Sequence, residues 1–392
     1  MREMKDSGNM WIGATPETWK MIPLKYLASY NDEVLSENTD DEFEFDYIEI
    51  GSVQYGRGII YKEHMKFKNA PSRARRIVRK DDIIVSTVRT YLKAVATIPA
   101  CNNSLIASTG FIVIRPHKVL PRFMNYALLS ESFISLVESH STGISYPAIN
   151  SVDVVKFKIP VPCRSEQERI AAFLDAECAE IDTVLEKTRA SIEEYKKLKQ
   201  AVITRTVTKG IFDKQIYPHN VKLKYLLYIA SGDAIRNEEL SEVGKYPAYG
   251  GGESLGFASK YNTLENSLIV GRVGARCGCV TYIDSKAWAT DNALIVHPIC
   301  NPRYMYYMLI YSQLNNLNTS NAQPLITATK IKNVVVPYFL EDICQRKIVD
   351  FLDEKCACID AIIEKKQQYI TEIENYKKFL IYEYVTGKKE VV

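Results

Sequence analysis

The stretch FLDAECAEIDTVLEK, residues 173–187, occurs a second time as FLDEKCACIDAIIEK, residues 351–365. Nine of the fifteen positions are identical, and the two copies lie 178 residues apart. Neither copy contains Pro or Gly, and the apolar residues recur at helical spacing. The chain therefore contains an internal duplication, and each copy includes a long helix.

The duplication extends upstream of these helices. The segment PRFMNYALLS, which begins at Pro121, resembles PRYMYYMLIYS, which begins at Pro302. Because the order of the matching segments is the same twice while the loops between them differ, we predict two similar domains, each followed by one long helix. The expected boundaries are an N-terminal arm at 1–19, a first domain at 20–163, its helix at 164–209, a second domain at 210–340 and its helix at 341–388.

Each predicted helix carries an apolar stripe with steps of three and four residues, which is typical of a helix packed along another helix. The obvious partner for each helix is its own copy, and the alternative is that each helix covers only its own domain. Gly210 and Gly387 are expected to end the helices. The residues expected in helix packing are Ile181, Leu185, Ile192, Tyr195, Leu198, Val202, Ile359, Ile363, Ile370, Ile373, Tyr376 and Leu380.

The segments before the helices predict α+β domains. Residues 83–85 and 268–270 are short β-rich runs, and each is preceded by polar residues. Pro121 and Pro302 fit the first turn of a short helix. We therefore expect two similar domains, each a twisted, mostly antiparallel sheet with short helices.

The composition is that of an ordinary globular protein, with 46% hydrophobic and 25% charged residues. No apolar run approaches the ~18 residues that a membrane span needs. The N-terminus lacks the apolar segment of a signal peptide. Nine cysteines without such a signal are typical of reduced thiols, and we expect a cytoplasmic protein.

Charge is distributed unevenly along the chain, although the net formal charge is only +3. Residues 31–50 hold nine acids and no base, whereas residues 56–93 hold eleven bases and three acids. A polyanion responds to such a local excess rather than to the average. Taken alone, however, charge favours a solvated basic surface.

Several motifs in fixed order resemble the specificity subunit of type I restriction–modification systems. They are DSGNMWIGATPETW near the N-terminus, YIEIGSV in the first domain, YPAYGGGESLGF and SLIVGRVGARCG in the second, and the twin FLD…ID helices followed by VTKG and VTG. Each motif is short, but their duplicated order is specific and covers nearly the whole chain. The first domain departs from the pattern, because residues 86–89 read STVR where residues 271–274 read GRVG. This departure leaves the glycine-dependent loop geometry of the first domain open.

The resemblance implies a sequence-specific DNA-binding protein without catalytic activity of its own. Two target-recognition domains would each read one half of a split, asymmetric site, and the long helices would form an antiparallel coiled coil that spaces them. The implied partners are double-stranded DNA, two modification (methyltransferase) subunits and restriction (motor-nuclease) subunits. S-adenosylmethionine, ATP and Mg would belong to those subunits, so no cofactor is expected in this chain.

The candidate DNA contacts of the first domain are a basic cluster and a loop tyrosine. Lys and Arg neutralise phosphates and hold a protein in register, whereas an Arg that pairs bidentately with guanine reads sequence. The candidates are Arg73, Arg75, Arg76, Arg89, Lys93 and Tyr146.

The candidates of the second domain lie in two glycine-bearing loops and before a proline. Residues 250–252 are three consecutive glycines, which let the backbone approach a surface closely, although a flexible hairpin tip is the alternative. A Gln in such a loop can pair with adenine or simply cap a turn. The candidates are Lys245, Tyr249, Gly251, Arg272, Arg276 and Gln323.

Two enzymatic alternatives have weaker support. Asn301-Pro302-Arg303-Tyr304 resembles the Asn-Pro-Pro-Tyr motif of adenine methyltransferases, but a helix start explains it better, and no glycine-rich cofactor loop follows a strand. Glu364 and Lys366 have the spacing of a nuclease motif but lie inside the predicted second helix.

A zinc site is the remaining alternative, since Cys277, Cys279, His297 and Cys300 are residues of zinc-ligand type. Their counterparts in the repeat are Leu92, Ala94, Arg115 and Lys118. Cysteines that replace Leu and Ala are more simply small apolar core residues, so no metal site is expected.

Overall fold

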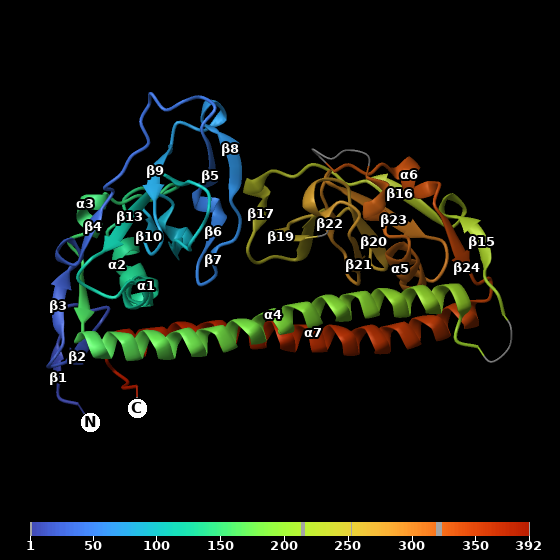
Figure 1. Ribbon diagram of the computed structural model, residues 1–392. Coiled ribbons are helices and arrows are strands. Elements are labelled where there is room, and N and C mark those ends of the chain that lie inside the picture. Colours follow the sequence, from blue (N-terminus) through green and yellow to red (C-terminus); the bar gives the residue numbers. More distant parts are fainter. Residues whose placement is uncertain (1, 213–215, 252, 319–323, 392) are drawn as a thin grey trace. The chain divides into compact units, whose positions relative to one another are not determined.

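The computed structural model describes residues 2–212, 216–251, 253–318 and 324–391 (Figure 1). The chain forms two compact units. The first contains the residues up to 187 together with those from 369 onward, and the second contains residues 188–368. Each of the two long helices therefore contributes one part to each unit.

The first unit contains two four-stranded sheets with the orders β11-β10-β13-β4 and β8-β5-β12-β9. Three short pairs, β1-β2, β6-β7 and β14-β3, complete it. Its strands are β1 Met4–Asp6, β2 Ala14–Pro16, β3 Lys20–Pro23, β4 Ala28–Tyr30, β5 Glu44–Ile48, β6 Val53–Gln54, β7 Gly58–Ile59, β8 Glu63–Lys66, β9 Ala74–Val78, β10 Ile83–Ser86, β11 Val95–Thr97, β12 Leu105–Ser108, β13 Phe111–Pro116 and β14 Lys158–Val161. Its short helices are α1 Pro121–Leu129, α2 Glu131–Ser139 and α3 Ser151–Val154.

The second unit repeats this order. Its sheets are β16-β23-β20-β21 and β17-β19-β18-β22, with the pair β15-β24. Its strands are β15 His219–Lys222, β16 Leu227–Ser231, β17 Leu240–Ser241, β18 Tyr246–Gly250, β19 Glu253–Ala258, β20 Ser267–Gly271, β21 Val280–Ile283, β22 Trp288–Ala289, β23 Ala293–Pro298 and β24 Val335–Tyr338. Its short helices are α5 Pro302–Tyr311 and α6 Ala328–Lys332.

Local sequence explains the matching elements. The runs in β10 and β20 are buried, as expected for apolar strands in the middle of a covered sheet. Pro121 and Pro302 begin α1 and α5, and the Asn301 side chain caps α5 by accepting a hydrogen bond from the Tyr304 backbone N–H (3.0 Å). All strand pairs are antiparallel except β5 with β12 and β18 with β22, so the predicted α+β, mostly antiparallel fold is confirmed.

The two long helices are α4, Arg164–Lys209, and α7, Asp342–Val385. Gly210 and Gly387 follow them in the left-handed conformation (φ +69° and +75°) that commonly ends a helix. Within each unit the helices run antiparallel. In the first unit, Phe173 of α4 lies against Tyr384 of α7, with ring centroids 4.5 Å apart, and Asp182 meets Lys377 at 2.7 Å. No helix within the described residues is both long and apolar enough to cross a membrane.

The second aspartate of the repeated motif joins the helices. Asp182 and Asp360 are equivalent in the two copies, and so are Lys199 and Lys377. Lys377 binds Asp182 at 2.7 Å in the first unit, and Lys199 binds Asp360 at 2.6 Å in the second. The same pair of residue types therefore links α4 to α7 once in each unit.

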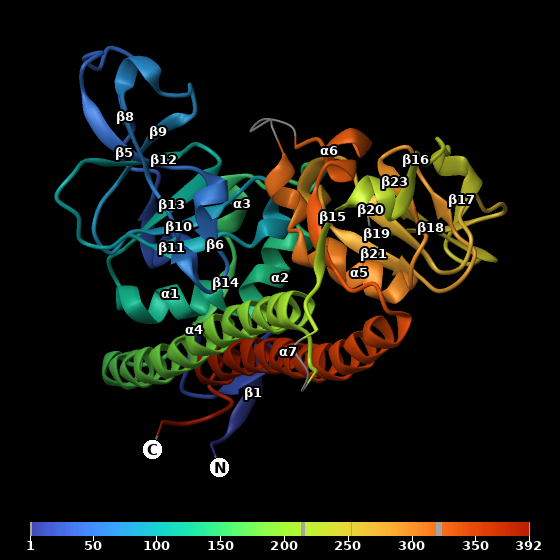
Figure 2. The ribbon, with the colours of Figure 1, turned by 90° about the vertical axis from the view of Figure 1, so that its right-hand side faces the viewer.

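The first aspartate of the motif fastens each domain to its own helix. Asp353 of α7 accepts hydrogen bonds from Arg303 (3.0 Å) and Tyr307 (2.5 Å), which both lie on α5. Burial and this carboxylate raise the pKa of the Tyr307 phenol, so it remains a proton donor. In the first unit, Asp175 of α4 binds Arg122 and Tyr126 of α1 in the same way. Figure 2 shows α1 beside α4, and the hydrogen bonds of Asp353 place α5 on α7.

The buried residues of the two helices differ from the predicted stripe at one pair of equivalent positions, one on each helix. Leu198 and Tyr376 are 49% and 52% exposed, so the prediction that they pack is wrong. A heptad stripe drifts by ~20° per heptad on a straight helix, and burial passes instead to Ile203 and Ile381. Tyr195, Val202, Ile363 and Ile373 are partly buried, and the buried positions of the stripe are Ile181, Leu185, Ile192, Ile359, Ile370 and Leu380.

The segment predicted as an N-terminal arm is part of the first unit. Arg2 bridges Glu166 in the first turn of α4 (2.5 Å) and Glu390 near the C-terminus (3.0 Å). Trp19 donates a hydrogen bond to the same Glu166 (2.9 Å), and Lys388 donates to backbone carbonyls of the arm. The two ends of the chain are therefore joined at the beginning of α4.

We predict that Tyr307→Phe lowers the urea midpoint of unfolding, because it removes a hydrogen bond to a carboxylate worth about 1.5–3 kcal/mol while the ring stays. Tyr306→Phe is the matched control, since the Tyr306 hydroxyl makes no hydrogen bond within the described part of the chain. Circular dichroism during urea titration measures both midpoints. Equal midpoints for the two variants would contradict a fastening role for Asp353.

Candidate DNA interface

Each domain carries a tight turn after its central strand. In the first domain the turn Thr90–Leu92 lies between Arg89 and Lys93, which both have φ +51°. The matching positions of the second domain are Gly274 and Gly278, with φ +71° and +86°. The loop geometry that the sequence left open is therefore the same in both domains. In the first domain it is built from non-glycine residues, at a cost of about 1–2 kcal/mol for each left-handed residue.

A second loop packs on this turn in both domains. Val88 forms a backbone bridge with Ala148, and Val273 forms the matching bridge with Leu325. In the first domain this pairing brings two predicted contacts together, because the Arg89 guanidinium lies 5.2 Å from the centroid of the Tyr146 ring. The Tyr146 side chain is exposed, so one face of this pair is open to a ligand. The corresponding Gln323 of the second domain lies outside the described residues.

Lys93 does not join the Arg89–Tyr146 pair. Its ammonium lies 3.6 Å from the carboxylates of Glu131 and Glu138 on α2. Two acids thus neutralise this lysine, and its position favours a structural role over a phosphate contact.

The predicted basic cluster lies on β9 and the loop before it. Arg73 is exposed and faces Glu49 at 3.6 Å, and the Arg75 guanidinium packs over the Phe67 ring at 5.2 Å. Arg76 is half-buried, and burial lowers the pKa of its guanidinium. Its Nε atom is buried without a hydrogen-bond partner in the described part of the chain. Arg76 is therefore the least compensated cation of the cluster.

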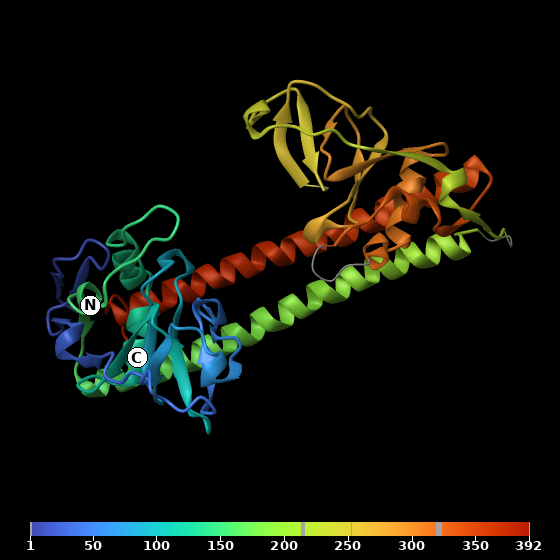
Figure 3. The same ribbon diagram turned by 90° about the horizontal axis from the view of Figure 1, so that it is seen from above.

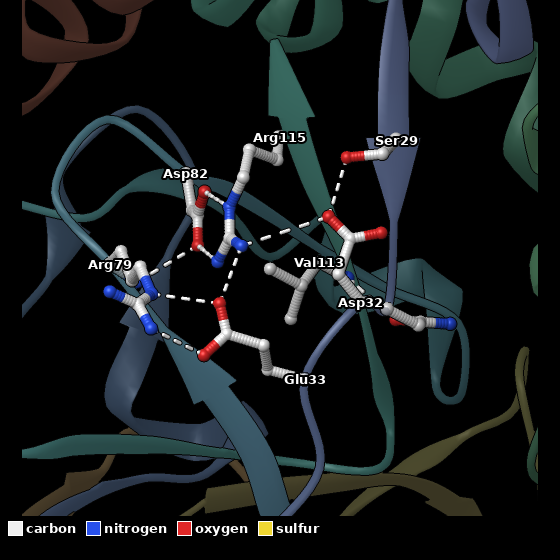
Figure 4. Close-up of polar contacts among 8 residues, drawn as sticks. Ser29, Asp32, Glu33, Arg79, Asp82, Val113 and Arg115 are labelled. Atoms are coloured by element: carbon white, nitrogen blue, oxygen red, sulfur yellow. Dashed lines mark hydrogen bonds and ion pairs between the residues drawn. The ribbon is translucent and has the colours of Figure 1, made fainter.

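Arg79 is held in a charge network next to this cluster, as Figure 4 shows. Its guanidinium donates two hydrogen bonds to Glu33 (2.8 and 2.7 Å), and Arg115 donates a third to the same carboxylate (2.7 Å). These two guanidinium groups lower the pKa of Glu33 to about 2. Arg115 also binds the buried Asp82 through two hydrogen bonds of 2.8 Å. In the second domain, Ser267 and His297 stand in the places of Asp82 and Arg115, and they form one hydrogen bond of 3.2 Å.

The acidic run thus neutralises much of the basic excess that follows it. Besides the Glu33–Arg79 pair, Glu42 binds both Lys66 and Lys68. Glu33 also ties its own segment to β9, since its carbonyl accepts a hydrogen bond from the Ile77 backbone N–H (3.2 Å). Within the described ranges, the basic candidates of the first domain that meet no carboxylate are Arg75, Arg76 and Arg89.

In the second domain the predicted loops meet. Gly251 at the β18–β19 turn has φ +63°, and a Cβ placed on it would lie 3.9 Å from the Arg276 Cβ and 4.0 Å from the Val273 carbonyl oxygen. Arg276 forms an ion pair with Glu253 of β19, which ties the hairpin to the turn. Arg272 makes a 3.4 Å hydrogen bond to Ser231 and no ion pair in the described part of the chain. Arg272 is therefore better placed than Arg276 to bind an external anion.

Tyr249 lies on β18, and Lys245 immediately precedes this strand. Tyr249 is half-buried against the sheet, and burial raises the pKa of its phenol. Lys245 is exposed, and its ammonium lies 5.2 Å from the centroid of the Tyr246 ring. Of these two candidates, Lys245 offers the more accessible charge.

The residues considered for zinc do not converge. Cys277 is buried, Cys279 is exposed, and His297 is hydrogen-bonded to Ser267. No group of three metal-ligand residues comes together among the residues that the structure describes. Nothing here favours a metal centre.

The fold defines a class of protein: a duplicated chain, with two copies of one α+β domain attached to paired long helices. The model of the type I restriction modification DNA specificity domain matches residues 16–194 and 219–374, and the chain belongs to this family. The resemblance inferred from the motifs is confirmed. Specificity subunits of type I systems act with DNA and with other subunits and are not themselves catalytic.

Known relatives agree with this assignment. The MjaVIII specificity subunit of Methanocaldococcus jannaschii is 24% identical, over 96% of this chain and 94% of the relative. The EcoprrI specificity subunit of Escherichia coli is 24% identical, over 64% of this chain and 71% of the relative. A chain from a solved structure, described as the basis of complex assembly and conformational transition of the type I R-M system, has a TM-score of 0.71 at 22% identity. It covers 96% of this chain and 99% of its own length, and it supports the fold.

Glu33→Gln should lower the urea midpoint at pH 7, because it removes a carboxylate bound by two guanidinium groups. The pKa of Glu33 is lowered from 4.5 to about 2 in the folded chain, so its contribution is present above the higher value and is lost as the pH falls through the lower one. We expect the difference from the unsubstituted chain to shrink between these two pH values. Glu37→Gln, at an exposed acid without an ion pair in the described residues, is the control. A difference that does not change with pH would rule out the charge network as its origin.

Arg89→Gly should unfold at a higher urea concentration than Arg89→Ala. Both variants lose the guanidinium and its contact with Tyr146, but only glycine relieves the left-handed conformation, which is worth about 1 kcal/mol. Urea titration of both proteins measures the difference. If alanine proved as stable as glycine, the backbone at this position would not be strained.

Proposed function

We propose that each domain reads one half of a bipartite, asymmetric DNA site. The proposal is supported by one observation above all: the same turn, bridged to the same second loop, carries different chemistry in the two domains. The first presents Arg89 stacked on Tyr146, and the second presents Arg272 beside a glycine turn. One scaffold with two different contact surfaces is what recognition of two different half-sites requires.

Within these surfaces, the cations have two roles. Arg75 and Lys245 hold phosphates, whereas Arg76, Arg89 and Arg272 are the candidates for base readout, because a guanidinium can pair bidentately with guanine. Tyr146 and Tyr249 pack on sugars, Gly251 lets the backbone approach the duplex, and Arg276 and Gln323 are the remaining candidates of the second domain. Arg73 and Lys93 contribute less, since each faces carboxylates.

The paired helices space the two half-sites and dock the partner subunits. Two modification subunits bind to the duplicated helices, and restriction subunits with motor and nuclease activity join them. A duplicated platform suits two identical partners, because equivalent surfaces recur on it. S-adenosylmethionine, ATP and Mg belong to these partners rather than to this chain. The complex acts in the cytoplasm.

Replacing residues 20–163 by the matching segment of a relative with another target should change one half of the methylated site and leave the other half intact. The reason is that the contacts of each domain lie on its own loops. Methylated-base sequencing of cells that carry the hybrid reads both halves at once. The reciprocal hybrid, with residues 210–340 replaced, should change only the other half. A hybrid that altered both halves would contradict two independent recognition domains.

A further inference from the structure

Strand pairing relates positions of the two domains to each other, and it makes Arg76 and Tyr261 equivalent. Val78 of β9 pairs with Leu105, which lies six residues before the start of β13. In the second domain, β23 is the counterpart of β13. Thr263 pairs with Ala287, which lies six residues before the start of β23. Val78 and Thr263 are therefore equivalent, and two residues upstream of them stand Arg76 and Tyr261.

The backbone conformation gives the same match independently. Asp81 and Asn266 are left-handed non-glycine residues, with φ +69° and +62°, and each precedes a polar residue and then the central strand. Five residues before them stand Arg76 and Tyr261 again. Tyr261 was not predicted as a contact, because no residue of the segment 73–80 is identical to its counterpart in 258–265.

Tyr261 belongs to a surface cluster of tyrosines and lysines. Its ring centroid lies 5.0 Å from that of Tyr246, and the Lys286 ammonium lies 4.7 Å from the Tyr261 centroid. Lys245 lies over Tyr246, and Lys260 precedes Tyr261 in the chain. These five residues are called the Tyr261 patch below.

The patch is accessible and uncompensated in charge. Tyr261 is 41% exposed, and all three lysines are exposed. None of these lysines forms an ion pair within the described ranges of the chain. The nearby carboxylate of Asp233 is engaged by the Asn262 side chain at 2.8 Å rather than by a lysine. The patch therefore presents two aromatic rings, each with a lysine ammonium over it, and a third exposed lysine next to Tyr261 in the chain.

The patch shares strand β18 with the predicted contact residue Tyr249 of its own domain. Tyr246 and Tyr249 lie on the same strand, three residues apart, which is about 10 Å at ~3.4 Å per residue. Beyond Tyr249 the strand reaches the turn at Gly251 and the Arg276–Glu253 ion pair. In Figure 3 this hairpin, drawn in yellow, stands away from the helices of its own unit. The patch is thus placed for a ligand of the recognition domain rather than for a protein bound to the helices.

We infer that the Tyr261 patch binds the sugar-phosphate backbone of the second half-site, with Tyr261 at the position that Arg76 holds in the first domain. Lysines contact phosphates as point charges, and aromatic rings pack on sugars without selecting a base. The patch therefore positions the second domain on the duplex and adds affinity rather than sequence preference. This inference rests on the proposed function.

The test uses the full-length chain assembled with its modification subunits and a duplex that contains the methylated site. Lys260→Ala and Lys286→Ala should each reduce the slope of log affinity against log salt by about 1. Between ~50 and ~200 mM salt, each variant should therefore lose about 3.5-fold less affinity than the unsubstituted complex. Tyr261→Ala should weaken binding several-fold, and Tyr261→Phe should restore it, since only the ring is required. The methylated sequence should stay the same in all four variants.

Two control variants distinguish a failure of this inference from a failure of the proposed function. Lys224→Ala removes a lysine that also lies over an exposed tyrosine of the second unit, 4.7 Å from the Tyr225 centroid but outside the patch, and its salt slope should not change. Arg89→Ala tests the proposed function in the first domain and should weaken binding to the same duplex.

If Arg89→Ala weakened binding while the patch variants kept the full salt slope, the inference would be overturned and the proposed function would stand. If a patch variant changed the bases that are methylated, the patch would be a base reader, and the inference would also be wrong. If neither Arg89→Ala nor any patch variant affected binding, the proposed function itself would fail.

Discussion

The carboxylates of Asp175 and Asp353 fix each recognition domain on its long helix. A carboxylate that accepts hydrogen bonds from a guanidinium and a phenol on one short helix constrains both the position and the rotation of that helix. Seven residues further along the same motif, a second aspartate binds a lysine of the other helix. One fifteen-residue repeat therefore specifies both how a domain sits on its helix and how the two helices align in each unit.

Much of the fold could be predicted from the sequence, because short sequence patterns that are weak evidence alone recur in both halves of the chain. The long helices, the glycines that end them and the proline-started short helices are local features, and the repeat located all of them. The packing stripe was wrong at Leu198 and Tyr376 because sequence periodicity does not reveal how a helix drifts relative to its partner. The left-handed Arg89 and Lys93 could not be predicted from residue type, which favours glycine there. Only the comparison with Gly274 and Gly278 revealed that the two turns are the same.

The candidate interface was harder to predict, since function there depends on which charges remain unpaired. Counting bases in residues 56–93 gave a large local excess, but Glu33 and Glu42 remove a substantial part of it through contacts between segments that are distant in sequence. Cations such as Arg76 and Arg272 stand out only after this pairing is known. Tyr261 was missed for a related reason, because strand register, not residue identity, relates it to Arg76.

The way the chain divides into units has a consequence for folding during synthesis. The second unit is one continuous segment, residues 188–368, and can close as soon as that segment has emerged from the ribosome. The first unit also needs residues from 369 onward, including Lys377, which binds Asp182, and Glu390, which meets Arg2. Contacts between residues so far apart in sequence form slowly, because a long loop must close first. The domain that is translated first is thus the last to be completed, and until the last part of α7 has been synthesised its part of α4 leaves an apolar face uncovered.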